Sequence, residues 1–233
     1  SGSFSVSLNE VILVAYAAYD NAGSTLDASL TSTHPSTPLF SRTQRQFVNG
    51  GKSGVSGGFI TRCPAGGSGA VTLLVPGATD VALVVYRLTN AQARFSHTGT
   101  SQEIPAAGGV GTAAVKGDFS TVTTNDLNFV SIVLAENTNS DIDVVSQGFT
   151  NDLEDNNANN ILGFGSKQAN AGGSLMAAWQ YVSGTNFWGA GYGFIVPALP
   201  SATSDGIWNT DLWGGGITHE FVSFKTQPSA GAG

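Results

Sequence analysis

The chain has 233 residues and a formal net charge of −7, and 11% of its residues are charged while 41% are hydrophobic. This length allows one large β domain or two small ones with a sizeable buried core. The negative charge argues against nucleic acid as a partner, because phosphate contacts need clustered Lys and Arg, and no apolar run is long enough to predict a membrane span.

The apolar segments are short, rich in β-branched residues and bounded by Gly, Pro, Asn, Asp and Ser, which is typical of β-strands. Some are apolar on both faces, as expected of central strands in a sandwich core. We therefore predict an all-β fold, an antiparallel, jelly-roll-like β-sandwich with very little helix. The expected strands, in chain order, are 10–19, 55–62, 70–75, 81–88, 113–122, 128–135, 142–147, 160–164, 175–182, 188–196 and 217–224.

The expected strands fall into two weakly similar parts. The strand at 9–15 has a counterpart at 128–135, and the Gly-rich stretch 57–88 has one at 172–196. No composition shift or linker separates the two parts. We expect an N-terminal arm over 1–7, a single sandwich domain with two similar strand sets over 8–225, and a flexible or partner-bound tail over 226–233.

The strand patterns between residues 8 and 198 resemble those of β-sandwich domains in phage virion proteins and bacterial surface proteins. The resemblance is carried by 10–19, 57–63, 70–75, 80–88, 123–130, Phe149, 173–181 and 188–196. The Ala-Gly-Trp step that usually follows the first strand of such domains is missing here. The resemblance implies a sandwich fold and a virion or an extracellular, cell-surface location, and it points to no specific activity.

The charge distribution along the chain favours a protein that packs against other subunits. Residues 1–117 carry a balance of +2, whereas residues 118–233 carry −9. Opposed charge of this kind can guide subunits together. We predict a structural subunit of a virion or surface assembly, a decoration, fibre or shell protein that contacts its own copies or other assembly proteins. Its expected basic interface residues are Arg42, Arg45, Lys52 and Arg62, which would meet the acidic stretch 136–155 of a neighbour.

The acidic tract 152–160 offers oxygen ligands at every second position, the spacing that a calcium loop uses. It does not fit an EF-hand, because Asn160 and Ser166 stand where Gly and a bidentate Glu are required. One interpretation is an irregular calcium site, and the other is a solvated Asn/Asp turn. The candidate ligands are Asp152, Asp155, Asn157 and Asn159.

All four tryptophans lie late in the chain, and two of them fall in a polar, Gly-rich stretch. Aromatic rings beside Asp and Asn can stack on sugars, anchor a protein partner or cover one end of a sandwich. The alternative function is therefore a secreted carbohydrate-binding or adhesin module, with or without calcium. Its candidate ligand-binding residues are Trp208, Asn209, Asp211 and Trp213.

No catalytic residue is predicted. Ser56 matches a G-x-S-x-G pattern formally, but the pattern leads into a strand rather than into the helix that a nucleophile elbow needs. Cys63 is expected to be a small core residue. The histidines at positions 34, 97 and 219 are expected to face solvent rather than a metal ion.

Overall fold

The computed structural model describes residues 2–34, 40–49, 51–98, 103–104, 115–122, 127–135, 142–144, 150–157, 160–168, 173–181, 188–199 and 218–226. These residues form antiparallel strands and contain no helix, so the prediction of an all-β, sandwich-like fold is confirmed. Within the same residues, no helical segment has the length and apolar character needed to cross a bilayer.

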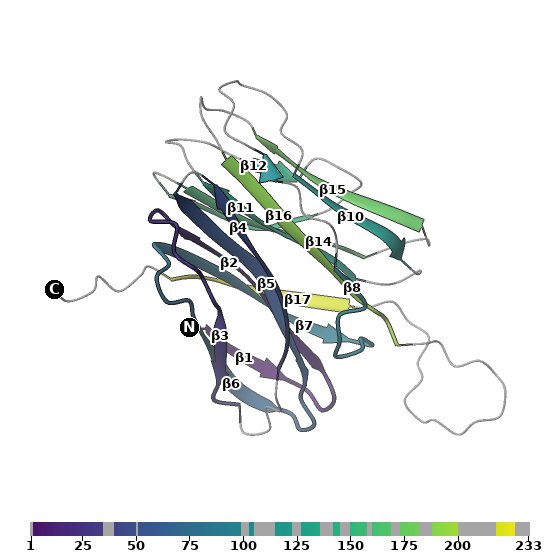
Figure 1. The fold of residues 1–233 in the computed structure, drawn as a ribbon. Coiled ribbons are helices and arrows are strands. Elements are labelled where there is room, and N and C mark those ends of the chain that lie inside the picture. The colour runs from purple at the N-terminus through teal and green to yellow at the C-terminus, as the bar shows by residue number, and fades with distance from the viewer. Residues whose placement is uncertain are drawn as a thin grey trace.

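The strands form four sheets (Figure 1). The first outer sheet has the order β1-β6-β3, with β1 at Gly2–Val6, β6 at Gly67–Leu74 and β3 at Ser29–Ser32. The first inner sheet has the order β17-β7-β2-β5-β4, formed by Thr218–Thr226, Asp80–Thr89, Val11–Asp20, Lys52–Arg62 and Ser41–Asn49.

The other two sheets come mainly from the second half of the chain. The second inner sheet has the order β13-β14-β11-β16-β8, formed by Thr150–Asn157, Asn160–Gln168, Leu127–Ala135, Trp188–Val196 and His97–Thr98. The short β9 at Glu103–Ile104 also pairs with β16. The second outer sheet has the order β10-β15-β12, formed by Val115–Val122, Gly173–Tyr181 and Ile142–Val144.

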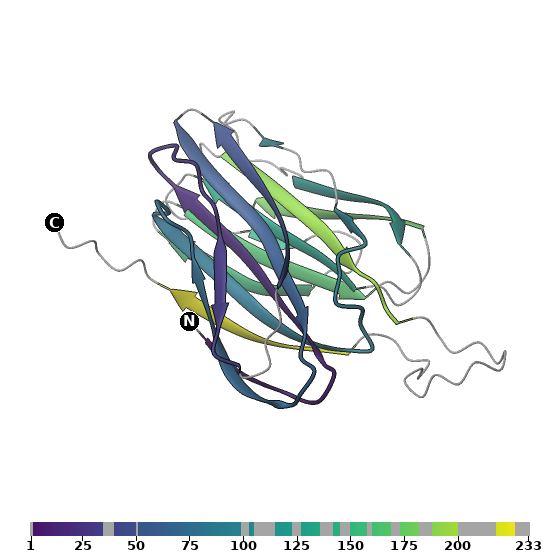
Figure 2. The same ribbon diagram turned by 60° about the horizontal axis from the view of Figure 1, so that its bottom comes forward.

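The inner sheets pack face to face, and each has an outer sheet along its other face (Figures 1 and 2). Strand β2 shows how the sequence produces this arrangement, because all ten of its residues are buried. Side chains alternate between the faces of a strand. Val11, Leu13 and Tyr19 therefore belong to the core between the two inner sheets, whereas Ile12 and Val14 belong to the core beneath the first outer sheet.

The two halves of the chain repeat the same topology. Strands β1 to β7 occupy the same places in the first two sheets as β10 to β16 occupy in the other two. The next strand of each half then crosses to the opposite half: β8 and β9 pair with β16, and β17 pairs with β7. The C-terminal β17, yellow in Figure 2, thus lies along the edge of a sheet built by the first half.

A glycine in β5 provides the close approach between the inner sheets. A Cβ atom on Gly58 would stand 2.9 Å from Cζ of Phe194 and 3.3 Å from Cζ of Phe95. These two rings meet edge to face, with centroids 5.1 Å apart. The ring of Phe194 therefore occupies the space that any larger residue at position 58 would need.

All eleven strands expected from the sequence are present, with ends that differ by a few residues. The structure also contains strands that were not expected, namely β1, β3, β4, β8, β9 and β13. Residues 2–6, expected as an arm, form β1 and pair with β6 of the same chain. At the other end, residues 218–226 form β17, and the remainder of the expected tail lies outside the described residues.

Candidate functional site

The four basic residues expected at an interface do not share one surface. Arg42 and Arg45 both lie on β4, but they occupy opposite faces because side chains alternate along a strand. Lys52 and Arg62 lie at opposite ends of β5, about 33 Å apart at the usual rise per residue. Arg62 donates hydrogen bonds to the carbonyl oxygens of Asn9 and Ala91, at 2.8 and 2.9 Å.

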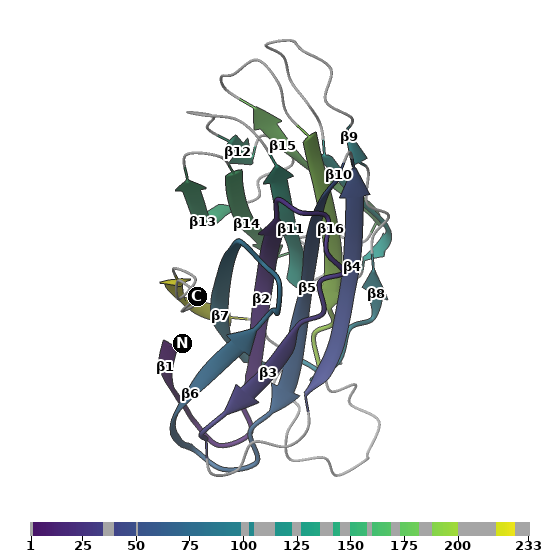
Figure 3. The same ribbon diagram turned by 60° about the vertical axis from the view of Figure 1, so that its left-hand side comes forward.

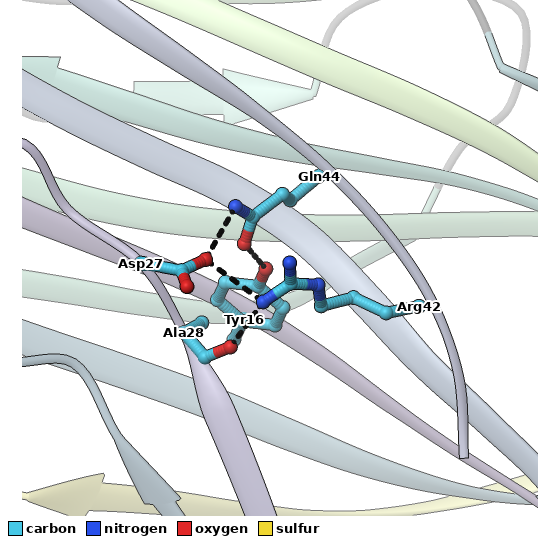
Figure 4. A network of polar contacts seen from close by, with 5 residues as sticks. All are labelled: Tyr16, Asp27, Ala28, Arg42 and Gln44. Carbon is cyan, nitrogen blue, oxygen red and sulfur yellow. Dashed lines mark hydrogen bonds and ion pairs between the residues drawn. The ribbon is translucent and has the colours of Figure 1, made fainter.

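Arg42 belongs to a polar network that fastens the chain before β3 onto β4 (Figure 4). Its guanidinium donates to Oδ1 of Asp27 at 2.8 Å and to the carbonyl oxygen of Ala28 at 2.6 Å. Gln44 donates to the same Asp27 oxygen and accepts a 2.7 Å hydrogen bond from the hydroxyl of Tyr16. The Gln44 hydrogen bond and the Arg42 charge hold the pKa of Asp27 below its usual value.

The opposite face of β4 contacts the second inner sheet. The hydroxyls of Thr43 and Tyr192 share a 2.5 Å hydrogen bond, and Phe47 is buried in the core between the inner sheets. The guanidinium carbon of Arg45, an exposed residue, lies 5.9 Å from the centre of the Phe47 ring. Strand β4 is therefore held on both faces, while its outer edge has no neighbouring strand among those described.

The candidate calcium ligands lie mostly in a strand, not in a loop. Asp152 and Asp155 are buried residues of β13, and Asp152 Oδ2 accepts a 2.7 Å hydrogen bond from the hydroxyl of Tyr86. Asn157 ends β13, and Asn159 lies outside the described residues. Among the residues described, no group of three or more His, Cys, Asp or Glu is arranged to hold a metal ion.

The candidate carbohydrate-binding residues belong to the polar, Gly-rich stretch that contains two of the tryptophans. Trp208, Asn209, Asp211 and Trp213 all lie outside the described residues. Carbohydrate binding by these residues therefore stays a prediction from the sequence.

Other residues singled out by the sequence are part of the interior. Ser56 is fully buried within β5, where no strand-to-helix turn exposes it. Cys63 is also fully buried, as predicted, and burial together with the nearby Glu10 raises the pKa of its thiol. His34 does not face solvent as expected; it is buried and stacks on Phe4, with ring centroids 5.8 Å apart.

The first outer sheet presents a face that the sequence interpretation did not identify. Its inward side chains, such as Phe4, Val6 and Val71, belong to the core. Its outward side chains carry no charge, and the hydroxyls of Ser5 and Ser68 share a 2.7 Å hydrogen bond across neighbouring strands. The outward residues, which we call the neutral face, are Ser3, Ser5, Ser29, Thr31, Ser68, Ala70, Thr72 and Leu74.

The alternation of small polar and apolar residues was visible in the sequence, for example in the stretches 3–6 and 29–32. These strands are short and carry Ser and Thr rather than large apolar residues, so they gave a weak strand signal. Leu74, at the end of β6, leaves 61% of its surface exposed on the neutral face.

Comparison with known proteins found no matching family model, no similar curated protein and no similar solved structure. Of the resemblance inferred from strand patterns, the antiparallel sheets packed as a sandwich are confirmed. A relationship to phage virion or bacterial surface proteins stays a prediction.

Proposed function

We propose that this protein is a non-enzymatic structural subunit of a virion or other surface assembly, acting through contacts with its own copies or with other assembly proteins. The observation that supports the proposal best is the neutral face. It is an exposed surface spanning three strands on which no outward side chain of the described residues is charged.

A surface of this composition suits contact between subunits. Charged residues are depleted from the cores of protein interfaces, because each buried charge must lose its hydration. Ser and Thr hydroxyls both donate and accept hydrogen bonds, and they have little side-chain entropy to lose on packing. The low charge content of the whole chain, 11%, agrees with a protein whose surface is largely covered in an assembly.

The resemblance of the strand patterns to those of virion and surface sandwiches, inferred from the sequence, favours a particle or cell surface as the location. The two-part topology adds a further argument. The inner sheets are covered on both faces, so the outermost sheets are the broad surfaces available to partners.

A charge placed on the neutral face tests the proposal. Thr72 is exposed on the central strand of that face, so Thr72→Lys puts an ammonium group where a neighbour would have to desolvate it. Thr25→Lys is the matched control, because Thr25 is exposed in the loop between β2 and β3, outside the outer sheet. Sedimentation velocity measures self-association of the protein, and co-sedimentation with the parent particle measures binding of the protein to that particle.

We expect the wild-type protein to self-associate or bind its particle, and Thr72→Lys to weaken that binding by at least about tenfold. Thr25→Lys should bind like wild type. A protein that stays monomeric at high concentration and low salt, and that binds no component of a particle or surface, would contradict the proposal. Equal binding by both variants would exclude the neutral face as the contact.

A further inference from the structure

The connection that carries β8 across to the second half of the chain is short and fixed in place. Residues 90–96 join β7 to β8. Along this path the backbone amide of Gln92 donates to the carbonyl oxygen of Pro197 at 2.9 Å, and the amide of Ser96 donates to that of Ile195 at 3.0 Å. These hydrogen bonds fasten the first crossover to β16 and the residues that follow it in the same molecule.

The connection that carries β17 back to the first half is longer than its path requires. Residues 200–217 lie between Leu199 and Thr218, the first residue of β17. The amide of Leu199 donates to the carbonyl oxygen of Asn90 at 2.7 Å, and Thr218 is the register partner of Thr89. Because Thr89 and Asn90 are neighbours in the chain, both ends of the connection lie at one place in the fold. Elements this close are usually joined by about two to six residues.

Strand β17 is attached to the rest of the fold along one edge. It pairs with β7 over its whole length, from Thr218 opposite Thr89 to Thr226 opposite Val81, and with no other strand among those described. In Figure 3 it lies beyond β7, on the side of the first inner sheet away from β4. Detaching β17 would therefore uncover β7 without separating any other pair of described strands.

The same strand of a neighbouring copy can occupy this place with the same pairs. Exchange of an identical element between copies has a low free-energy cost, because the contacts are the same. Within one molecule, a flexible connection holds a segment at an effective concentration in the millimolar range. Copies in contact, with centres about 45 Å apart, are themselves at about 20 mM. Fully extended, residues 200–217 reach about 60 Å, which exceeds that spacing.

We propose that β17 is donated between copies of this chain, so that β17 of one subunit pairs with β7 of its neighbour in the assembly. The proposal rests on the proposed function, since it names a second contact, besides the neutral face, through which subunits join. In this arrangement the short first crossover ties the two halves of one chain together, and the long second crossover ties one chain to the next.

A disulfide between register partners tests the donation. Thr89→Cys/Thr218→Cys places thiols on paired residues of β7 and β17. The Cα atoms of such pairs are about 4.5–5.5 Å apart, which suits a disulfide. Oxidised as a dilute monomer, the variant forms the bond within one chain and can no longer donate β17. We expect it to self-associate at least about tenfold more weakly than the same variant after reduction, as measured by sedimentation velocity.

Leu30→Cys/Leu73→Cys is the matched control. These residues are register partners in β3 and β6, which pair within the first half. Oxidation of this variant should leave its self-association unchanged. The native Cys63 is fully buried, and Thr218→Cys alone shows whether Cys63 enters any cross-link. Circular dichroism of both redox states shows whether each variant keeps the wild-type fold.

Oxidation after assembly gives the converse readout. Reduced Thr89→Cys/Thr218→Cys is first allowed to associate and is then oxidised. The bonds should join different chains, and denaturing electrophoresis without reductant should show covalent dimers or longer chains. The Leu30→Cys/Leu73→Cys control should remain a single chain.

Three results would overturn this inference. If Thr89→Cys/Thr218→Cys associates equally well in both redox states and its bonds stay within chains, another surface joins the subunits and the proposed function still stands. If the protein binds a particle component but never self-associates, strand donation fails and the proposed function survives. If it neither self-associates nor binds a component of a particle or surface, both fail.

Discussion

The hydroxyl of Tyr86 donates a 2.7 Å hydrogen bond to Oδ2 of Asp152, and this bond joins the two inner sheets through the interior of the molecule. Tyr86 lies on β7 and Asp152 on β13, so the bond also connects the two halves of the chain. Burial and the nearby Asp152 carboxylate raise the pKa of Tyr86 well above its usual value, which keeps the phenol protonated as the donor.

Removing this donor should cost more stability than removing a tyrosine hydroxyl whose hydrogen bond is only partly buried. Tyr86→Phe deprives a buried carboxylate of a hydrogen bond, and we expect the free energy of unfolding to fall by about 1–3 kcal/mol. Tyr16→Phe, which removes the partly buried hydrogen bond to Gln44, is the control and should cost less. Urea unfolding of both variants measures the difference. Equal losses of unfolding free energy would mean that the hydrogen bond to Asp152 contributes no more to stability than the one to Gln44.

The space at Gly58 should not tolerate a methyl group. Gly58→Ala places Cβ against the buried Phe194 ring, which Phe95 holds from its edge, so we expect a loss of about 1–3 kcal/mol. In Gly58→Ala/Phe194→Leu the smaller side chain relieves the clash. The loss in this double variant should be less than the sum of the single losses. Strict additivity in chemical denaturation would contradict the close approach.

Acid should destabilise the protein partly through Asp20. Burial alone would raise the pKa of Asp20, but hydrogen bonds from Ser24, Ala22 and Thr79 outweigh it and hold the pKa below its usual value. The stabilisation is therefore present above the unfolded pKa of about 3.9 and is lost as pH falls through the folded value.

Asp20→Asn should lower the free energy of unfolding at neutral pH and have a smaller effect below about pH 4. Unfolding curves measured at a series of pH values check this. A variant with the wild-type dependence on pH between about 2 and 5 would show that the Asp20 turn does not contribute.

Because each half of the chain contributes strands to a sheet of the other half, we expect the two halves to unfold together. The halves can be followed separately, because all four tryptophans lie in residues 179–213 and the single cysteine, Cys63, lies in the first half. Tryptophan fluorescence and the reactivity of the Cys63 thiol, measured across one urea series, should give coincident midpoints. Labelling of Cys63 well before the fluorescence change would indicate two independently unfolding units.

The sequence alone predicted the strands that form the interior. Strands such as β2, β7 and β16 consist largely of apolar residues, and burial on both faces requires that composition wherever the strand lies. The sequence did not indicate β4 and β13, because these two strands consist largely of polar residues. Edge strands keep one side toward solvent, so polar stretches such as 41–46 and 150–157 carry no clear alternation.

The sequence also did not predict correctly where several charged residues lie in the fold. Arg42, Arg45, Lys52 and Arg62 are close in sequence and were expected on one surface, but strand alternation and the length of β5 separate them. Asp152 and Asp155 were candidates for a loop that binds calcium, and they lie buried in β13 instead. The spacing of residues along the chain does not show which sheet a residue belongs to or which face of that sheet it lies on.

Composition and hydrophobic pattern, which are local properties, determined that this protein is all-β, that its core strands are apolar on both faces and that its surface is poor in charge. Only the tertiary structure decided that two equivalent strand sets exchange their final strands and that a neutral face lies on the first outer sheet. These features depend on pairing between residues far apart in the chain, because strand order and sheet stacking are set by non-local contacts that no short window of sequence contains.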